Sequence, residues 1–328
     1  TSSVTRSFIS PAALLVNVIA KISYGRTSRL AIMYAIRRVS TRVFPEPAPA
    51  TTSSGDPAWE TAFCCCGLSP ASNGSVALMP RSLLGWCIME PIADSEIKRV
   101  LVINAHPDDS DFGASGTIAQ WVKQGIEVSY VLCTNGDQGG EESGFTKEEM
   151  PEVRQREQRA ACAALGISDV AFLNYVDGHL EPTIALRKDI VRQIRRVKPD
   201  RMICQSPERN WDRIGASHPD HLAAGEATIQ AVYPDARNPF AFTDLLEEGL
   251  QPWKVKEVWM QGHAHPDHFV DITDTFHFKL AALKEHASQT SHMDNLEEML
   301  REWGQRNAGL GELPEGRIAE AFKIVNTN

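Results

Sequence analysis

The sequence contains neither a long uninterrupted apolar segment nor a regularly spaced set of cysteines. The longest apolar stretches near its start, residues 12–20 and 30–36, are interrupted by basic residues before they reach the roughly 20 residues that a membrane-spanning helix needs. The seven cysteines follow no framework spacing, which argues against disulfides and indicates a reducing compartment. We therefore expect a cytoplasmic protein with no integral membrane segment.

Acidic residues are scarce at the front of the chain and abundant behind it. Residues 1–88 hold eight Lys or Arg and three Asp or Glu, whereas the remaining residues hold 25 and 39. The acidic body lacks the broad basic surface that non-specific binding to nucleic acid requires. We therefore expect no nucleic-acid partner.

Residues 1–88 differ from the rest of the chain in other ways. Residues 1–45 are rich in Ser and Arg and poor in acids, which is typical of an organelle transit peptide. Because the chain begins with Thr1 and Met89 stands just before the first regular strand, we favour a non-native or disordered extension over residues 1–88 and a catalytic domain over residues 89–328. The cysteine run at 64–66 lies in this extension. Three consecutive thiolates cannot easily turn onto one ion, so incidental sequence is favoured there over a metal cluster.

From Lys98 onward, short apolar runs alternate with helical periods. Strands are expected at residues 99–104, 128–133, 170–173, 201–205 and 255–261. Helices are expected at residues 113–124, 148–165, 185–197, 218–232, 275–288 and 296–303. This alternation predicts a single α/β domain with a doubly wound, mostly parallel Rossmann-like sheet and helices on both faces.

Polar side chains that could bind a ligand or take part in catalysis cluster just after the predicted strands. They lie at residues 106–109, 135–140, 177–179, 208–221 and 263–268. In open α/β sheets, ligands bind beyond the carboxyl ends of the strands. These segments should therefore meet in one site.

The first motif, AHPDD, places His106, Asp108 and Asp109 between a strand and a helix. Imidazole and carboxylate are ligands of catalytic zinc, because such a mixed set leaves one position open for water. Adjacent carboxylates point in different directions, so one can bind a metal while its neighbour faces the metal's water. An aspartate that only caps the following helix is the alternative, and the nearby histidine argues against it.

The second motif is SHPDH at residues 217–221. Ser217 and Pro219 mark the start of a helix, so His218 and His221 share one of its faces. Such a pair taken alone would be surface residues or a cap. Opposite the first motif, it is expected to supply a ligand and a catalytic neighbour. Asp220 either orients a histidine or caps the helix.

AHPDD followed about 110 residues later by HPDH resembles the LmbE/PIG-L family of zinc-dependent de-N-acetylases. Further likeness is found in Arg154-x-x-Glu157 and in the TNGD run at 134–137, and it extends over most of residues 98–292. The resemblance implies one Zn²⁺ per chain. It implies that His106, Asp109 and His221 bind the metal. It also implies that Asp108 is the general base and that His218 is a second catalytic residue.

Members of this family act on N-acetylglucosaminyl lipids, on thiol cofactor precursors such as the mycothiol intermediate, and on related sugars. The resemblance thus implies a hydrolase that removes an N-acetyl group from an amino sugar or a related small molecule, with metal-activated water and Asp108 as general base. The sequence departs from the family at two places. Ser110, followed by Asp111, stands where many members have Glu, and Ala216 stands where the mycothiol deacetylase has Tyr.

Five further residues are expected near the substrate, namely Arg154, Asp177, His179, Trp211 and His263. Arg154 could clamp a polar substrate group or pair with an acid on its own helix, such as Glu157. Asp177 and His179 could bind sugar hydroxyls or could be ordinary turn residues. Trp211 lies in the loop before the second motif and could stack on a sugar ring.

The histidines at 263, 265 and 268 form an HxHxxH cluster, for which loop residues that line the pocket or face solvent are favoured over a second metal. Two other functions compete with deacetylation of an amino sugar. One is an amidase for another small amide such as a thiol conjugate, and the other is a non-catalytic sugar-binding or metal-binding protein. Retention of Asp108 and His218 argues against a pure binder. The expected partner is a small N-acetylated sugar or conjugate, and the oligomeric state is left open.

Overall fold

The computed structural model describes residues 68–70, 76–78 and 90–327. The chain divides into two units, Thr1–Trp86 and Cys87–Asn328. In the first unit the described part is one antiparallel pair of strands, β1 (Leu68–Pro70) and β2 (Val76–Leu78). The predictions for the targeting segment at 1–45 and the cysteine run at 64–66 lie outside the described residues. The upstream extension over residues 1–88 stays a prediction.

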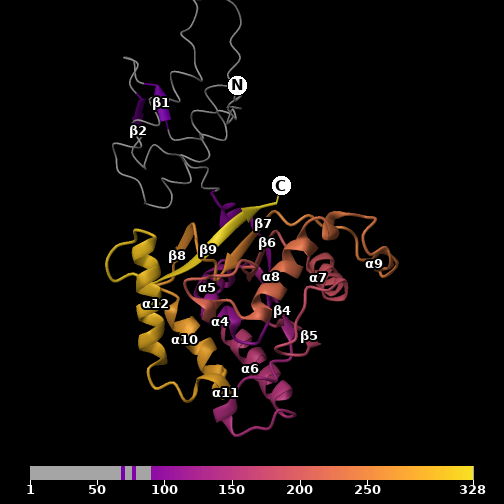
Figure 1. The fold of residues 1–328 in the computed structure, drawn as a ribbon, viewed down its shortest axis with the longest axis horizontal. Helices are drawn as coiled ribbons and strands as arrows, with labels where there is room; N and C mark the ends of the chain where they lie inside the picture. The colour runs from indigo at the N-terminus through magenta and orange to yellow at the C-terminus, as the bar shows by residue number, and fades with distance from the viewer. Residues whose placement is uncertain (1–67, 71–75, 79–89, 328) are drawn as a thin grey trace, which may run out of the picture. The chain divides into compact units, whose positions relative to one another are not determined.

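The second unit is built on a seven-stranded sheet with the order β5-β4-β3-β6-β7-β9-β8 (Figure 1). Its strands are β3 (Arg99–Asn104), β4 (Glu127–Thr134), β5 (Asp169–Tyr175), β6 (Arg201–Gln205), β7 (Glu257–Gln261), β8 (His268–Asp271) and β9 (Ala319–Asn326). The strands β3 to β7 pair in parallel, and β9 runs antiparallel to both of its neighbours. The predicted mostly parallel α/β sheet is confirmed.

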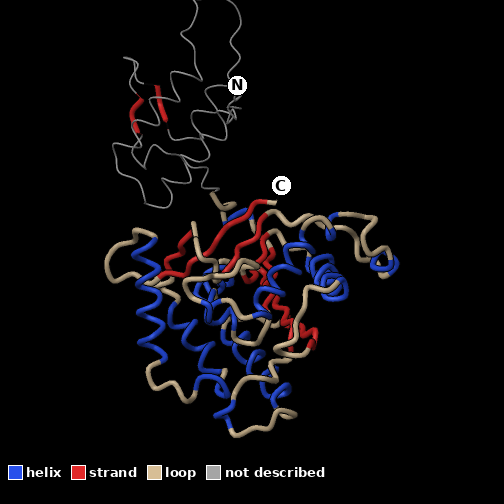
Figure 2. Tube along the Cα trace, in the orientation of Figure 1, coloured by secondary structure: helices blue, strands red, loops and turns tan. Residues whose placement is uncertain are grey.

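Helices cover both faces of this sheet (Figure 2). Strand β3 shows why, because its alternate residues face opposite sides and nearly all of them are buried. Leu101 and Ile103 join the core with α7 (Ile184–Val197) and α8 (Pro219–Val232). Val100 and Val102 join the core on the other face, with α5 (Ser115–Lys123) and α6 (Met150–Ala164). A near-continuous apolar strand therefore requires helices on both sides.

The remaining elements are short or lie near the C-terminus. They are η1 (Asp94–Glu96), α4 (Asp109–Gly113), η2 (Glu141–Ser143), η3 (Ile214–Ala216), η4 (Asp235–Arg237), α9 (Asp244–Glu247), α10 (Phe276–Glu285), α11 (Ala287–Thr290) and α12 (Leu296–Leu310). Helix α10 packs against α5 and α6. Helix α12 packs against β9 and contributes Leu296 and Leu300 to a third core cluster with Ile318.

A buried ion cluster closes the sheet at the amino ends of its strands. The Arg201 guanidinium donates to Asp94 Oδ1 at 2.5 Å, to Glu257 Oε1 at 2.5 Å and to the backbone carbonyl of Ile92 at 2.6 Å. It also lies over the rings of Trp121 and Trp259, with its central carbon 4.8 and 4.2 Å from their centroids. The segment that precedes β3 is thereby tied to the centre of the sheet.

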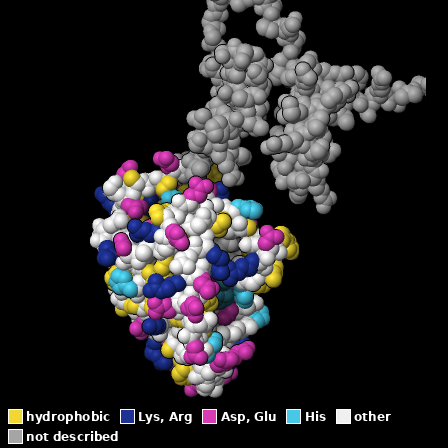
Figure 3. All heavy atoms as spheres, turned by 90° about the vertical axis from the view of Figure 1, so that its left-hand side faces the viewer, with side chains coloured by type: hydrophobic (Ala, Val, Ile, Leu, Met, Phe, Trp, Pro, Cys, Tyr) yellow, Lys and Arg dark blue, Asp and Glu magenta, His cyan; other side chains and the backbone are white. Residues whose placement is uncertain are grey.

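Within residues 68–70, 76–78 and 90–327, every helix is too short or too polar to cross a bilayer. On the face shown in Figure 3, the basic and acidic side chains of the second unit are interspersed rather than gathered into fields of one sign.

Candidate metal centre

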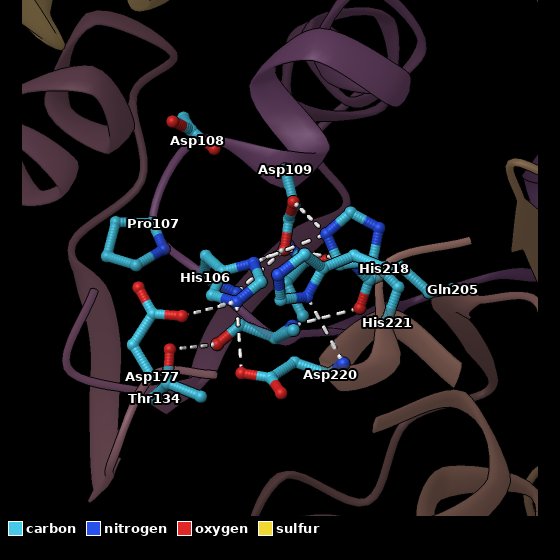
Figure 4. Close-up of polar contacts among 12 residues, drawn as sticks. His106, Pro107, Asp108, Asp109, Thr134, Asp177, Gln205, His218, Asp220 and His221 are labelled. Carbon is cyan, nitrogen blue, oxygen red and sulfur yellow. Dashed lines mark hydrogen bonds and ion pairs between the residues drawn. The ribbon is translucent and has the colours of Figure 1, made fainter. Parts of the chain in front are cut away.

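The candidate site lies beyond the carboxyl ends of β3, β5 and β6. AHPDD follows β3, Asp177 follows β5, and SHPDH begins α8 after β6. Because β3 and β6 are neighbours in the sheet, the two motifs meet despite their distance in the sequence. Figure 4 shows the side chains of His106, Asp109, His218 and His221 converging.

One ring nitrogen of His106 faces the second motif. His106 Nδ1 lies 3.2 Å from His221 Nε2 and 3.5 Å from Asp109 Oδ2. Asp109 Oδ1 lies 2.9 Å from His221 Nε2. The other oxygen, Asp109 Oδ2, accepts hydrogen bonds from the His106 backbone N–H at 2.7 Å and from Gln205 Nε2 at 2.7 Å. The structure thus brings together the three side chains expected to bind a metal, with Asp109 Oδ1 turned toward the histidines.

The opposite nitrogen of His106 is held by two buried carboxylates. His106 Nε2 lies 3.0 Å from Asp177 Oδ1 and 3.2 Å from Asp220 Oδ2. Asp220 is fully buried and also accepts the backbone N–H groups of Gly178 and Leu180, at 2.7 and 3.2 Å. Two carboxylates favour a proton on Nε2, so in the neutral ring the Nδ1 lone pair points at His221.

The carboxylates around His106 change the ionisation of the whole group. Burial by itself lowers the pKa of His106, but Asp109, Asp177 and Asp220 outweigh it and raise that pKa to about 12. Burial raises the pKa of Asp109, whereas His221 and His106 hold it well below its usual value. The group therefore carries an excess of negative charge, and a cation beside His106 would be stabilised.

This donor set fits a catalytic zinc ion. Two ligand atoms bound at about 2.0 to 2.1 Å and at a tetrahedral angle lie roughly 3.3 Å apart. The separations of 3.2 Å between the two imidazole nitrogens and 2.9 Å between His221 Nε2 and Asp109 Oδ1 are close to that value. Two nitrogens and one oxygen leave a fourth position open, as catalytic sites require. His218 also offers a ring nitrogen within 4.8 Å of those of His106 and His221.

Asp108 lies apart from this cluster in Figure 4 and is held from α6. Its backbone is left-handed, with φ of 91°. Its Oδ2 accepts from Arg154 Nη2 at 3.0 Å, and Arg154 also donates to the backbone carbonyl of Pro107. Burial raises the pKa of Asp108, and the Arg154 charge opposes that rise.

Arg154 therefore pairs with an acid outside its own helix. The alternative partner, Glu157, instead accepts from the backbone N–H and the hydroxyl of Ser288, at 2.7 and 2.6 Å. The guanidinium is buried, which places it behind Asp108 rather than on an open surface. Arg154 fixes the carboxylate predicted to be the base.

His218 caps α8 with its own side chain. Its Nδ1 accepts the backbone N–H of Asp220 at 3.2 Å. A neutral ring must then carry its proton on Nε2, so that this nitrogen is a hydrogen-bond donor. Burial lowers the pKa of His218, and the neighbouring His106 and His221 lower it further. The geometry favours a neutral donor over a protonated histidine.

The other residues expected near the substrate differ in their contacts. Asp177 is buried against His106, and its second oxygen accepts the Gln138 N–H at 3.2 Å, so it orients the imidazole. His179 Nδ1 lies 3.1 Å from the Asp177 carbonyl. Trp211 is 81% exposed in the loop before the second motif.

The side chains of the three HxHxxH histidines, at 263, 265 and 268, do not converge on one point. His263 Nε2 lies 3.1 Å from Glu208 Oε2, and its ring centroid lies 6.3 Å from that of His265. His268 begins β8 and packs edge-on against Trp259. Among the described residues, the groups with metal-ligating atoms close together contain His106, not these three.

Sequence reasoning missed the glutamine that supports Asp109. Gln205 Oε1 accepts the Ala105 backbone N–H at 2.9 Å while its Nε2 binds Asp109 Oδ2. Its signal was a polar residue that directly follows the apolar run at residues 202–204. Ser110, which replaces the family's glutamate, exchanges hydrogen bonds with Asn104 at 2.7 and 2.9 Å.

These features define an α/β protein with a candidate histidine–aspartate metal site at the carboxyl ends of its strands. The family model described as GlcNAc-PI de-N-acetylase (PIG-L) matches residues 101–232. The chain belongs to the PIG-L (LmbE-like) family.

Named relatives are similar to more than half of this chain. Diacetylchitobiose deacetylase of Thermococcus kodakarensis is 34% identical over 208 residues, which are 63% of this chain and 75% of that protein. The Bacillus cereus protein named "Probable N-acetyl-alpha-D-glucosaminyl L-malate deacetylase 2" is 33% identical over 203 residues, 60% of this chain and 86% of that one. The solved structure of N,N'-diacetylchitobiose deacetylase from Pyrococcus horikoshii, in complex with its inhibitor MPG, superimposes with a TM-score of 0.67 at 26% identity, covering 85% of this chain and 95% of that chain.

Proposed function

We propose that this protein is a zinc-dependent hydrolase that removes the acetyl group from the nitrogen of an amino sugar. The observation that carries the proposal is the convergence of His106 Nδ1, His221 Nε2 and Asp109 Oδ1. The carboxylates of Asp177 and Asp220 behind His106 support it, because carboxylate–histidine pairs are typical of metal-binding imidazoles.

The relatives support the substrate class. One relative is named as a deacetylase of diacetylchitobiose, and another as a probable deacetylase of N-acetyl-alpha-D-glucosaminyl L-malate. Both align with this chain over most of their own lengths. Both names contain an N-acetylated glucosamine. The exposed ring of Trp211, in the loop that leads to His218, suits stacking on a sugar.

When bound here, zinc would supply Lewis-acid chemistry that lowers the pKa of water to about 7. The chain's own residues would handle the protons. The carboxylate of Asp108 accepts a proton from the attacking water, and Arg154 at 3.0 Å holds that carboxylate in one position. The buried Arg154 favours the ionised form, which a general base requires.

His218 would act on the other side of the reacting amide. Its Nε2–H donor, fixed by the cap at Nδ1, can bind the oxygen on which negative charge develops. A neutral donor suffices for this role. Protonation of the departing amine falls to Asp108, after it has taken the proton of the water.

The substitution Asp108→Asn tests the assignment of the base. The amide keeps the size of the side chain but removes its basic oxygen, so we expect zinc to remain and the rate to fall about 10²- to 10⁴-fold. Metal content would be measured by atomic emission, and free amine would be measured with N,N'-diacetylchitobiose and N-acetylglucosamine. Asp169→Asn is the matched control, because Asp169 pairs with Arg196 on the exposed surface.

Loss of zinc in Asp108→Asn would make Asp108 a ligand. Near-normal turnover would remove it from the mechanism. The alternative of an amidase for another small amide predicts zinc and a working base, but release of amine only from non-sugar amides. A non-catalytic binder predicts zinc without turnover of any amide.

A further inference from the structure

One face of α6 holds a single peptide bond of the first motif from both of its ends. Arg154 donates to the carbonyl of Pro107, and Gln158 Oε1 accepts the backbone N–H of Asp108 at 2.9 Å. That carbonyl and that N–H belong to the same peptide unit. Arg154 and Gln158 are four residues apart, so they lie on the same face of the helix.

The amide of Gln158 is itself fixed in one orientation. Its Nε2 donates to Asp111 Oδ2 at 2.9 Å, and His286 Nε2 lies 2.9 Å from that same oxygen. Gln158, Asp111 and His286 are all buried. Since the carboxylate can only accept, the NH₂ group of Gln158 must face Asp111, and its oxygen must face Asp108.

This support is needed because Asp108 adopts an unfavourable backbone. A φ of 91° is rare for residues other than glycine, and such a conformation persists only where the surroundings enforce it. Rotating the Pro107–Asp108 peptide would break the bonds to Arg154 and Gln158 together. The backbone geometry of Asp108 sets the direction of its carboxylate.

We propose that Gln158 is a positioning residue that, locked by Asp111 and His286, holds the Asp108 peptide so that the Asp108 carboxylate stays aligned for proton transfer. This inference rests on the proposed role of Asp108 as general base. It assigns to a buried glutamine a part in the rate rather than in metal binding, since its contacts lead to Asp108 and not to His106, Asp109 or His221.

The substitution Gln158→Met tests the inference, because methionine has similar length but cannot accept or donate the two bonds. We expect unchanged zinc content, unchanged KM and a kcat lower by about 10-fold or more, since small misplacements of a catalytic group cost rate. The exchange of the Asp108 amide proton, measured by NMR, should become faster. Gln155→Leu is the matched control, because Gln155 lies on the same helix and bonds Asn174 at the surface.

A double substitution separates positioning from a general loss of structure. In the Asp108→Asn background, Gln158→Met should lower kcat by less than about 3-fold further, because residues that act as one unit are not additive. An equal loss in both backgrounds would show a merely structural role and overturn the inference. If Gln158→Met does not fold, Gln158→Asn, one methylene shorter, replaces it with the same expectation.

Normal kcat in Gln158→Met beside an impaired Asp108→Asn would overturn the positioning role alone. Full activity of Asp108→Asn would show that Asp108 is not the general base and would overturn the role of Gln158 with it, whereas the proposed deacetylation would stand.

Discussion

The two ring nitrogens of His106 have different roles in the proposed zinc site, and substitutions can tell which of them binds the metal. In the proposed assignment, Nδ1 binds zinc and Nε2 is oriented by Asp177 and Asp220. The decisive perturbation is Asp177→Asn. Asp177 Oδ1 faces His106 at 3.0 Å and Oδ2 accepts the N–H of Gln138 at 3.2 Å, so both oxygens face donors.

The amide that Asp177→Asn introduces cannot serve both donors. Whichever way it turns, its NH₂ group faces either the Nε2–H of His106 or the N–H of Gln138. Asp220 keeps one carboxylate on His106 Nε2, at 3.2 Å, so the imidazole is weakened as a ligand but not released. Loss of such an outer partner typically lowers metal affinity about 10- to 100-fold, or about 1.4 to 2.7 kcal/mol of binding free energy.

Zinc affinity would be measured by competition with a chromophoric chelator of known affinity, on apo protein at fixed pH. The zinc affinity of Asp177→Asn should be lower by the stated factor, and that of Asp169→Asn should equal the affinity of the unsubstituted protein. His221→Ala should lose zinc. The reasoning would be refuted if Asp177→Asn abolished binding while His221→Ala retained it. That pattern would mean that His106 Nε2, Asp177 and Asp220 bind the ion. These three residues also offer ligand atoms that lie within 4.8 Å of one another.

Two further outcomes are expected. His218→Ala should keep zinc, because the three candidate ligand atoms remain, and lose about 10²- to 10³-fold in kcat as one oxyanion donor disappears; loss of zinc on metal analysis would instead make it a ligand. A chain that begins at Met89 should unfold at the same temperature as the full chain, whereas one that begins at Lys98 loses Asp94 and the Ile92 carbonyl as partners of buried Arg201 and should unfold at a clearly lower temperature, measured by calorimetry. Equal melting of the two shortened chains would count against the anchoring role of that segment.

Much of the sheet could be predicted because its parallel strands are simple apolar runs. The strands at 99–104 and 201–205 were placed with their observed bounds, since both are buried on two faces. The antiparallel edge was missed. Strand β8 is short and half-buried, and β9 carries the buried Glu320, which reads as polar until its ion pair with Lys279 is known.

Helix α12 runs past its predicted end for a related reason. The prediction ended this helix at residue 303, before Gly304, yet the helix continues to Leu310. A Cβ on Gly304 would come within 2.3 Å of Ile318 Cγ2, so the glycine there permits close packing against the residue that precedes β9. A tertiary contact of this kind leaves no local trace in the sequence.

The candidate site was predictable where chemistry is concentrated in short motifs. His106, Asp109 and His221 meet because β3 and β6 are neighbours. The alternation of strands and helices predicts that both motifs lie at the carboxyl ends of parallel strands, but it does not give the strand order. The supporting residues were not predictable. Gln205 ends a strand and Gln158 stands between charged residues of a helix, outside any motif, and Asp177 was expected to meet a sugar rather than an imidazole. Their roles depend on distances of a few ångströms that no motif encodes.

The two ends of the sheet treat buried charge differently, and the difference bears on the need for a metal. At the amino ends, Arg201 is matched within the protein by Glu257 and by Asp94. At the carboxyl ends, Asp108 has Arg154 and Asp111 has His286. The acids left over, Asp109, Asp177 and Asp220, share one imidazole, His106, whose pKa they raise to about 12, and His221 adds to it only on the side of Asp109. Buried carboxylates in such excess are costly unless a cation joins them, so the charge balance at the carboxyl end would favour the zinc ion proposed there.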